Sequence, residues 1–264
     1  VAETGSSVIV TNEGNGDLTS SLPRVQIVTV GIEKLIPSLE DLSTMLRVLA
    51  RSATGQEMTA YTSLYSGPRK EGHSEGPTEY HVILLDNGRS GMLGGEYQSM
   101  LRCIRCGACL NHCPVYSAIG GHAYGWIYPG PMGSVLTPLM RGFDSNVDLP
   151  NACSLNGVCE TICPVRIPLP DLLRQHRVEQ HKRKSSSLTS RLIFEVWSYF
   201  VRRPRFYQLA LFMPLLILNR IGRKRGFLKR LLFVHGWTQS RDFPSPAART
   251  FQWQWQEKVR ENIE

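Results

Sequence analysis

The sequence has no hydrophobic run long enough to cross a bilayer. Its most apolar stretch, residues 206–218, is 13 residues long and is interrupted by Pro214, whereas a spanning helix needs about 20 apolar residues. The chain also lacks a secretory signal pattern and begins with Val1 instead of Met, so we expect that the N-terminal part of a longer chain is missing. Cysteines without a secretory signal predict a cytoplasmic protein, with peripheral contact to the inner membrane face left open.

Motifs for nucleotides and nucleic acids are also missing. We find neither a G-x-G-x-x-G loop nor a Walker pattern, and no zinc-finger, RNA-binding or helix-turn-helix pattern accompanies the basic charge. That charge is uneven: residues 1–164 contain 10 Lys+Arg and 15 Asp+Glu, whereas residues 165–264 contain 20 and 7. A basic tail on an acidic body predicts an acidic partner surface or an anionic membrane face, and no nucleic-acid partner.

What the sequence does contain is a set of seven cysteines confined to two short runs. The first run reads C-x2-C-x2-C-x3-C-P, which is the ligand spacing of bacterial iron–sulfur proteins. The second run keeps this frame but has Asn156 at one cysteine position. An odd number of cysteines argues against a closed set of disulfides, and zinc sites use pairs of ligands held tetrahedrally. Iron–sulfur ligation is therefore the preferred interpretation of Cys103, Cys106, Cys109, Cys113, Cys153, Cys159 and Cys163.

The two runs predict two clusters with crossed ligation, because the fourth cysteine of such a run ligates the other cluster in two-cluster ferredoxins. Cluster 1, predicted as [4Fe-4S], would take Cys103, Cys106, Cys109 and Cys163. Cluster 2 would take Cys153, Cys159 and Cys113, with Asn156 in the fourth position. A cluster with one non-thiolate corner is either [3Fe-4S] or a [4Fe-4S] cluster with an oxygen ligand, and the spacing leaves both open.

Residues 1–92 have the pattern of an α/β domain. Three runs, 7–11, 25–30 and 81–85, are β-branched or apolar nearly throughout, which is typical of buried parallel strands. Between the last two runs, leucines recur at spacings of three and four over residues 35–49, which predicts a helix. Ser38 followed by Asp41 resembles a capping box at its start. The polar loops that follow the first and third runs are expected to be tight turns rather than binding sites.

Residues 93–184 hold the cysteine runs. We expect a helix over residues 96–102 leading into the first run, and another over residues 169–184 after the second. The segment between the runs, 120–133, is rich in glycine and aromatic residues. Glycines let backbone amides approach cluster sulfurs, and such hydrogen bonds tune the reduction potential. Its aromatic side chains are expected either to shield a cluster from water or to pack in the core.

Residues 185–264 form a basic, aromatic extension. A helix is predicted over residues 192–200, and residues 206–218 are flanked by arginine clusters. Such a stretch either packs on the cysteine domain or a partner subunit, or lies in a membrane interface. The alternation at residues 251–255 is typical of a strand or a docking tail. The whole chain is thus predicted to be an α+β, multidomain protein.

Residues 102–116 and 120–138 resemble the lactate utilisation protein B family of iron–sulfur proteins. Residues 11–16, 31–34 and 86–90 look like the end of that family's LUD domain, and the tail is similar to its C-terminal extension. The resemblance implies a partial LUD domain at 1–92, a two-cluster α-helical ferredoxin domain at 93–184 and a helical extension at 185–264. Members carry a longer LUD domain.

The resemblance also implies a function. A member of this family would be an electron-transfer subunit in the oxidation of L-lactate to pyruvate, with two [4Fe-4S] clusters passing electrons to a respiratory acceptor. The implied partners are a cysteine-rich subunit of the heterodisulfide-reductase type and a separate LUD protein. Asn156 puts an all-cysteine second cluster in question.

A second resemblance covers residues 153–164 alone. The spacing C-x5-C-x3-C-P is similar to the [3Fe-4S] run of the succinate dehydrogenase iron–sulfur subunit, which has an α-helical ferredoxin fold and passes electrons to quinone. Two further alternatives stay open. One is an enzyme that binds substrate at an open iron corner beside Asn156, although no acid–base residue stands out. The other is a redox-sensing or scaffolding protein.

Overall fold

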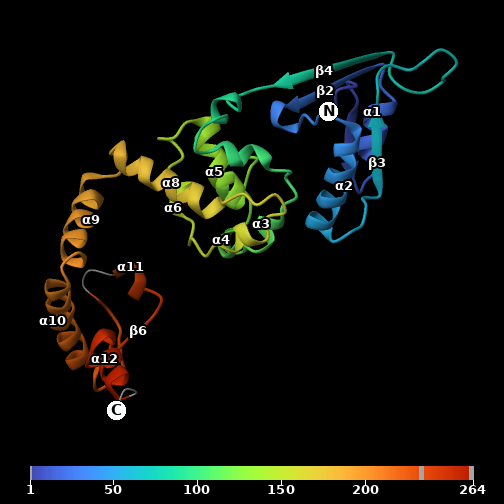
Figure 1. Ribbon diagram of the computed structural model, residues 1–264. Helices are drawn as coiled ribbons and strands as arrows, with labels where there is room; N and C mark the ends of the chain where they lie inside the picture. Colours follow the sequence, from blue (N-terminus) through green and yellow to red (C-terminus); the bar gives the residue numbers. More distant parts are fainter. Residues whose placement is uncertain (1, 232–234, 262–264) are drawn as a thin grey trace. The chain divides into compact units, whose positions relative to one another are not determined.

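The computed structural model describes residues 2–231 and 235–261 (Figure 1). The chain is a multidomain protein of mixed helix and strand, as predicted, and it divides into two compact units between Ser185 and Ser186. The first unit contains all seven cysteines. It therefore contains every residue of the predicted clusters.

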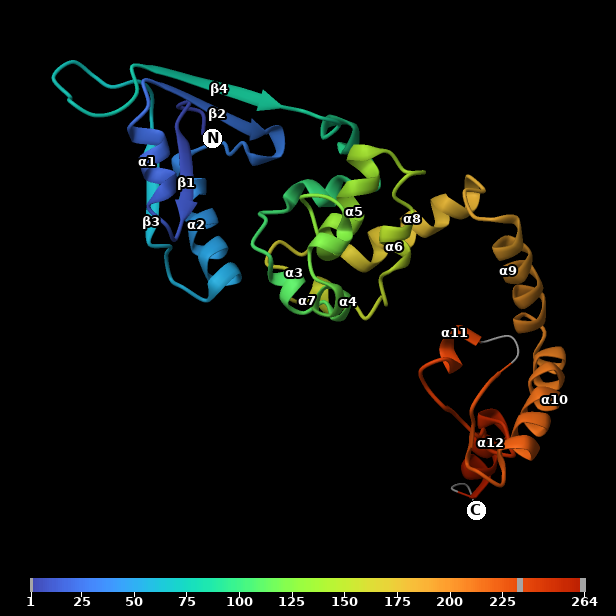
Figure 2. The same cartoon turned by 180° about the vertical axis from the view of Figure 1, so that it is seen from behind.

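The N-terminal segment contains two separate strand pairs. Strands β2 (Val25–Gly31) and β4 (Glu79–Leu85) are parallel and lie side by side in both views (Figures 1 and 2), which confirms that runs 25–30 and 81–85 are parallel strands. The prediction that these strands are buried is wrong for this chain, because Ile27 is 59% exposed and Ile83 is 49% exposed.

The other pair corrects a second prediction. Strand β1 (Ser7–Thr11) is antiparallel to β3 (Tyr61–Tyr65), so it is not a parallel strand. The sequence pattern did not indicate β3, because its tyrosine, threonine and serine residues look polar when read without a partner. Pairing with β1 supplies the backbone hydrogen bonds that such a strand needs.

Two helices lie between these strands in the chain: α1 (Asn15–Ser21) follows β1, and α2 (Leu39–Thr54) precedes β3. The predicted capping box is confirmed: the Asp41 amide donates to the Ser38 hydroxyl at 3.2 Å, and the Ser38 amide donates to the Asp41 carboxylate at 3.2 Å. A short 3₁₀ helix, η1 (Ile32–Lys34), begins directly at the carboxyl end of β2. It therefore places two charged side chains, Glu33 and Lys34, at the end of a parallel strand.

The segment with the cysteines is built from short helices around one core. Val135 on α5 and Leu173 on α8 are fully buried at its centre. The helix predicted over 169–184 is confirmed as α8, whereas the helix predicted over 96–102 is a 3₁₀ helix that begins two residues later. The elements are η2 (Ser90–Met92), η3 (Gln98–Arg102), α3 (Ala108–Asn111), α4 (Pro114–Ile119), η4 (His122–Tyr124), α5 (Gly130–Arg141), α6 (Asp148–Asn151), α7 (Val158–Thr161) and α8 (Leu169–Lys182).

The second unit has a different character. No residue of α9, which the structure describes in full, is buried, and Trp197 is 60% exposed. Of the two alternatives for residues 251–255, the strand is wrong. These residues belong to α12, where Phe251 stacks on Trp255 one helical turn away, with ring centroids 5.9 Å apart. The elements are α9 (Leu188–Val201), α10 (Pro204–Gly222), β5 (Phe227–Leu228), α11 (His235–Thr238), β6 (Phe243–Pro244) and α12 (Phe251–Glu261).

The apolar stretch at 206–218 lies within α10, which continues through Pro214. Across residues 2–231 and 235–261, we find no helix with the length and apolar character that a membrane crossing requires.

Candidate iron–sulfur site

The two cysteine runs fold on the same backbone frame, and each position of the second run lies 50 residues after its counterpart. Arg105 and Leu155 both have positive φ, 58° and 56°, and Gly107 and Gly157 follow with φ of 78° and 83°. Each glycine is directly followed by a one-turn helix, α3 or α7. The runs are therefore structurally equivalent, and Asn156 takes the place that Cys106 has in the first run.

The structure brings together the four cysteines predicted for cluster 1. Cys103, Cys106, Cys109 and Cys163 line one cavity of about 70 Å³. Three of them come from the first run and the fourth from the second. Apolar side chains, among them Met132 and Ile167, complete the wall of this cavity. This is the arrangement that crossed ligation requires.

The three cysteines predicted for cluster 2 also lie near one another. Burial, together with the neighbouring Cys153 and Cys113 thiols, raises the pKa of the Cys159 thiol to about 11. Asn156 is exposed, and its side-chain oxygen accepts a hydrogen bond from the Val158 amide at 3.3 Å. Cys106 lines the first cavity, whereas the Asn156 side chain is engaged with the first backbone amide of α7.

The thiol environment fits an iron–sulfur cluster. Burial raises the pKa of Cys109 to about 12, and burial also raises the pKa of Cys103. Buried thiols of this kind ionise when bound iron supplies compensating positive charge. Backbone amides already point at the sulfurs: Tyr116 to Cys113 at 3.4 Å, Leu155 to Cys153 at 3.3 Å and Ile167 to Cys163 at 3.4 Å.

Within the described part of the chain, no group of three or more His, Cys, Asp or Glu side chains converges on a position for a single metal ion. Convergence is not needed for a cluster, because each thiolate binds a different iron. The cavity between four thiols is thus the informative feature, and it favours a cluster over an isolated ion.

The segment rich in glycine and aromatic residues packs beside the cysteines. The Met132 amide opposes the rise in the pKa of the Cys109 thiol, so a backbone amide from this segment lies close to a predicted ligand. Gly133 lets α5 approach the preceding backbone closely, since a Cβ there would lie 1.6 Å from the backbone oxygen of Tyr128. Tyr124 is buried, and burial together with the nearby Cys113 thiol raises the pKa of its hydroxyl to about 12. Aromatic side chains therefore both pack in the core and cover cysteines.

A cation from outside each run contacts the carbonyl oxygen of its first cysteine. The Lys34 ammonium donates to the Cys103 carbonyl, and the Arg177 guanidinium donates to the Cys153 carbonyl. Arg177 also donates to the Pro150 carbonyl at 2.8 Å. These two cations were not singled out by sequence reasoning. Lys34 could have been found from the sequence, because it belongs to residues 31–34, which carry part of the family resemblance.

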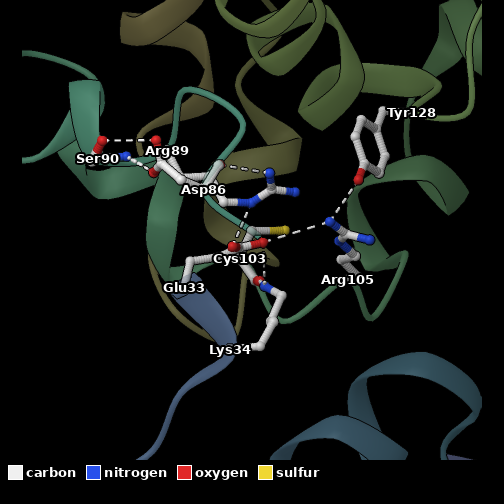
Figure 3. Close-up of polar contacts among 8 residues, drawn as sticks. All are labelled: Glu33, Lys34, Asp86, Arg89, Ser90, Cys103, Arg105 and Tyr128. Atoms are coloured by element: carbon white, nitrogen blue, oxygen red, sulfur yellow. Dashed lines mark hydrogen bonds and ion pairs between the residues drawn. The ribbon is translucent and has the colours of Figure 1, made fainter. Parts of the chain in front are cut away.

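Figure 3 shows the charged group around Lys34. The Glu33 carboxylate, 8% exposed, forms an ion pair with Arg89, whose Nε lies 2.5 Å from it. Arg105 Nη2 lies 3.6 Å and Lys34 Nζ 3.7 Å from the same carboxylate. Burial lowers the pKa of Lys34, and Glu33 opposes that shift. We call Glu33, Lys34, Arg89 and Arg105 the Glu33 network.

The polar loop at 86–90 forms a turn that places Arg89 in this network. Asp86 accepts hydrogen bonds from the Ser90 amide at 2.7 Å and the Ser90 hydroxyl at 2.9 Å, and these lower the pKa of Asp86. Asn87 has φ of 43° and Gly88 of 82°. The prediction of turn chemistry is confirmed, and the turn delivers Arg89 to Glu33 (Figure 3).

Comparisons with known proteins match the chain in three consecutive segments. A family model described as "LUD domain" matches residues 1–85. A "4Fe-4S dicluster domain" matches residues 99–167, which include both cysteine runs. A model described as "Lactate utilisation protein B, C-terminal" matches residues 172–260.

Curated relatives match over nearly the whole chain. It is 41% identical to "Lactate utilization protein B" of Oceanobacillus iheyensis, over 98% of this chain and 55% of the relative. It is 44% identical to "Lactate utilization protein B 1" of Bacillus mycoides, over 99% of this chain and 54% of the relative. The chain thus spans about half the length of the curated relatives it matches. No solved structure matches it.

Proposed function

The chain belongs to the lactate utilisation protein B family over the half of its relatives' length that it spans, and from this premise we propose that it is an electron-transfer subunit in the oxidation of L-lactate to pyruvate. The observation that carries the proposal is the cavity that Cys163 of the second run shares with three cysteines of the first, in a segment that matches a 4Fe-4S dicluster domain. Two neighbouring clusters suit one-electron transfer in sequence, because each can accept and release an electron without a proton donor.

The residues would divide the work as follows. Cluster 1 is held by Cys103, Cys106, Cys109 and Cys163. Cluster 2 is held by Cys113, Cys153 and Cys159. The two sets are close neighbours, since the Cys159 thiol of the second set also raises the pKa of Cys109 in the first. Bound clusters supply the one-electron chemistry, and the chain supplies ligation, amide hydrogen bonds and exclusion of water.

Cluster 2 would have three cysteine ligands and a fourth corner without a protein thiolate. The exposed Asn156 side chain supports this, because its oxygen is engaged with the Val158 amide. An open corner is compatible with a [3Fe-4S] cluster or with a [4Fe-4S] cluster that has an oxygen ligand. The electrons would leave towards a respiratory acceptor, for which quinone is the class suggested by the second run.

The proposed partners are a cysteine-rich subunit of the heterodisulfide-reductase type and a separate LUD protein. We assign the exposed apolar surface of α9 and α10 to the cysteine-rich subunit. Residues 188–225 contain eight Lys+Arg and one acidic residue, Glu195, so the matching surface is expected to be acidic around an apolar centre. Flotation with anionic vesicles tests the alternative, because binding to the vesicles in place of the subunit would overturn this assignment.

The test of the function is Cys106→Ser in the full chain with its partners. We expect loss of cluster 1 and of lactate-dependent electron flow, because a serine at this corner no longer supplies the thiolate. Ser117→Ala, an exposed change on α4 near the first run, is the matched control. Unchanged iron content and activity in Cys106→Ser would refute the proposal, and turnover of lactate by the isolated chain would favour an enzyme instead.

A further inference from the structure

The Glu33 network links the end of strand β2 to the loop that carries the first two cysteines. We propose that Glu33 and Lys34 are positioning residues for cluster 1, and that the LUD segment thereby sets the reduction potential of this cluster and not of cluster 2. The inference rests on the proposed function, because it assumes that cluster 1 is held by the first cysteine set.

The geometry begins at Gly31, the last residue of β2. A Cβ at this position would lie 2.2 Å from the Glu33 carboxylate and 2.8 Å from Arg89 Nε. Glycine thus leaves the space into which the carboxylate turns back against the strand end. The next residue, Lys34, is then directed at the Cys103 carbonyl (Figure 3).

Arg105 lies between the ligands Cys103 and Cys106, and the network holds it. Its φ of 58° is in the left-handed region, which is uncommon for a residue other than glycine. Its guanidinium lies 3.6 Å from Glu33, donates to the Tyr128 hydroxyl at 2.7 Å and stacks 4.6 Å from the centre of the Tyr128 ring. Lys34 fixes the start of this loop and Glu33 fixes its middle, so both contacts come from the LUD segment.

The network is screened from water on one side. The Arg89 and Glu33 side chains are 6% and 8% exposed, and the cavity beside them, lined by Met100, Leu136 and Met140, has a volume of about 20 Å³. Charges in such surroundings interact more strongly than in bulk water. Lys34 and Arg105 are 29% and 41% exposed, so solvent weakens their share.

The balance of charge has a definite sign. Among the residues drawn in Figure 3, the two carboxylates Glu33 and Asp86 face the three cations Lys34, Arg89 and Arg105, which leaves one positive charge in excess near Cys103. A cluster becomes more negative when it is reduced. The excess charge therefore stabilises the reduced form and raises the reduction potential of cluster 1.

Cluster 2 has an equivalent contact from a different source. Arg177 on α8 donates to the Cys153 carbonyl, the counterpart of Cys103. Since α8 packs against α5, α6 and α7 in the core around the cysteines, the second run takes this cation from that same core. Only the first run takes its cation from the LUD segment, which is why the proposed effect is confined to cluster 1.

The experiment is a redox titration of the full chain, reconstituted anaerobically and followed by EPR with iron quantitation. The variants are Lys34→Met, Lys34→Arg and, as the matched control on the other run, Arg177→Met. We expect Lys34→Met to lower the reduction potential of cluster 1 alone and Lys34→Arg to restore it. Arg177→Met should shift cluster 2 alone.

Glu33→Gln is a second, independent variant. It releases Arg105, so we expect a broadened cluster 1 signal and several-fold faster loss of cluster 1 iron to a chelator, with cluster 2 unchanged. Loss of cluster 1 alone in Lys34→Met would likewise support positioning.

Two outcomes would overturn the inference: unshifted potentials in Lys34→Met at full iron content, or a parallel loss of both clusters, which would indicate a general folding role. A failure of the proposed function looks different. The unmodified chain would then bind no iron, or its clusters would not be reduced in the presence of lactate and the partners.

Discussion

The two cysteine runs share a backbone frame and differ in what surrounds it. Residues 103–114 and 153–164 have the same two left-handed positions, the same one-turn helix and the same closing Cys-Pro. They differ at Cys106 and Asn156, and in the origin of the cation on the first carbonyl. A frame fixed by local sequence can therefore be repeated, while its chemistry is changed by one ligand and by distant contacts.

The distance along the chain makes the difference concrete. Lys34 and Cys103 are 69 residues apart, whereas Arg177 and Cys153 are 24 residues apart. The second run takes its cation from α8, which packs in the same core as the cysteines. The first run takes its cation from the LUD segment, so we expect cluster 1 to be the one that responds to changes in that segment.

The largest expected effect comes from replacing the last cysteine of each run by serine. If ligation is crossed, Cys163→Ser removes cluster 1 although it changes the second run, and Cys113→Ser removes cluster 2 although it changes the first. We expect complete loss of the corresponding EPR signal in each variant. If Cys163→Ser removed the signal of cluster 2 instead, and Cys113→Ser that of cluster 1, ligation would not be crossed.

Asn156→Cys should remove the main chemical difference between the runs. A fourth thiolate would complete the corner of cluster 2, so we expect its EPR spectrum to approach that of cluster 1. We also expect the iron content to rise to about eight atoms per chain if cluster 2 is [3Fe-4S] in the unmodified chain. EPR measures the spectrum, and iron analysis measures the content. Asn156→Ala is the control, since it removes the hydrogen bond from the Val158 amide and adds no thiolate. A spectrum that changes equally in both variants would exclude ligation by the new cysteine.

Alanine substitutions at Gly107 and Gly157 test whether the two frames are equivalent. Both glycines have positive φ, and a Cβ meets nothing within 4 Å at Gly157 and only Leu110 at 3.8 Å at Gly107. The cost is then backbone strain alone, about 1–2 kcal/mol in each case. Denaturant unfolding of the two variants should give equal losses, and clearly unequal losses would mean that the frames differ.

The smallest effect concerns acid and the helix that supports the second run. His176, next to Arg177 on α8, is buried between Tyr97 and the Val135 carbonyl, and burial lowers its pKa from the ordinary value of 6.5. As the pH falls, the His176 imidazole therefore takes up a proton in the unfolded chain before it does so in the folded chain. Its contribution to the free energy of unfolding is complete above about pH 6.5 and is lost below that pH, by at most about 1.4 kcal/mol per pH unit. Acid titration should release cluster 2 before cluster 1 in the unmodified chain, and His176→Gln should remove that order.

Local patterns allowed the sequence to predict a substantial part of this molecule. The cysteine spacing indicated which side chains would meet, and the Ser38–Asp41 pair indicated where α2 begins. Strand β3 was missed because its pairing with β1 bridges about 50 residues and leaves no periodic apolar pattern. The Glu33 network was missed for the same reason, since charged residues become informative only when folding buries them together. Residues 251–255 alternate like a strand, but the helical contact of Phe251 with Trp255 prevails.

The most direct test of the central claim is iron and sulfide quantitation with EPR on the anaerobically purified chain, first oxidised and then reduced. We predict at least about seven iron atoms per chain, enough for one [4Fe-4S] and one [3Fe-4S] cluster. A near-isotropic signal in the oxidised state would identify cluster 2 as [3Fe-4S], and a silent oxidised state with two interacting signals on reduction would identify a second [4Fe-4S] cluster. Iron for a single cluster, or none, in properly handled protein would contradict the claim.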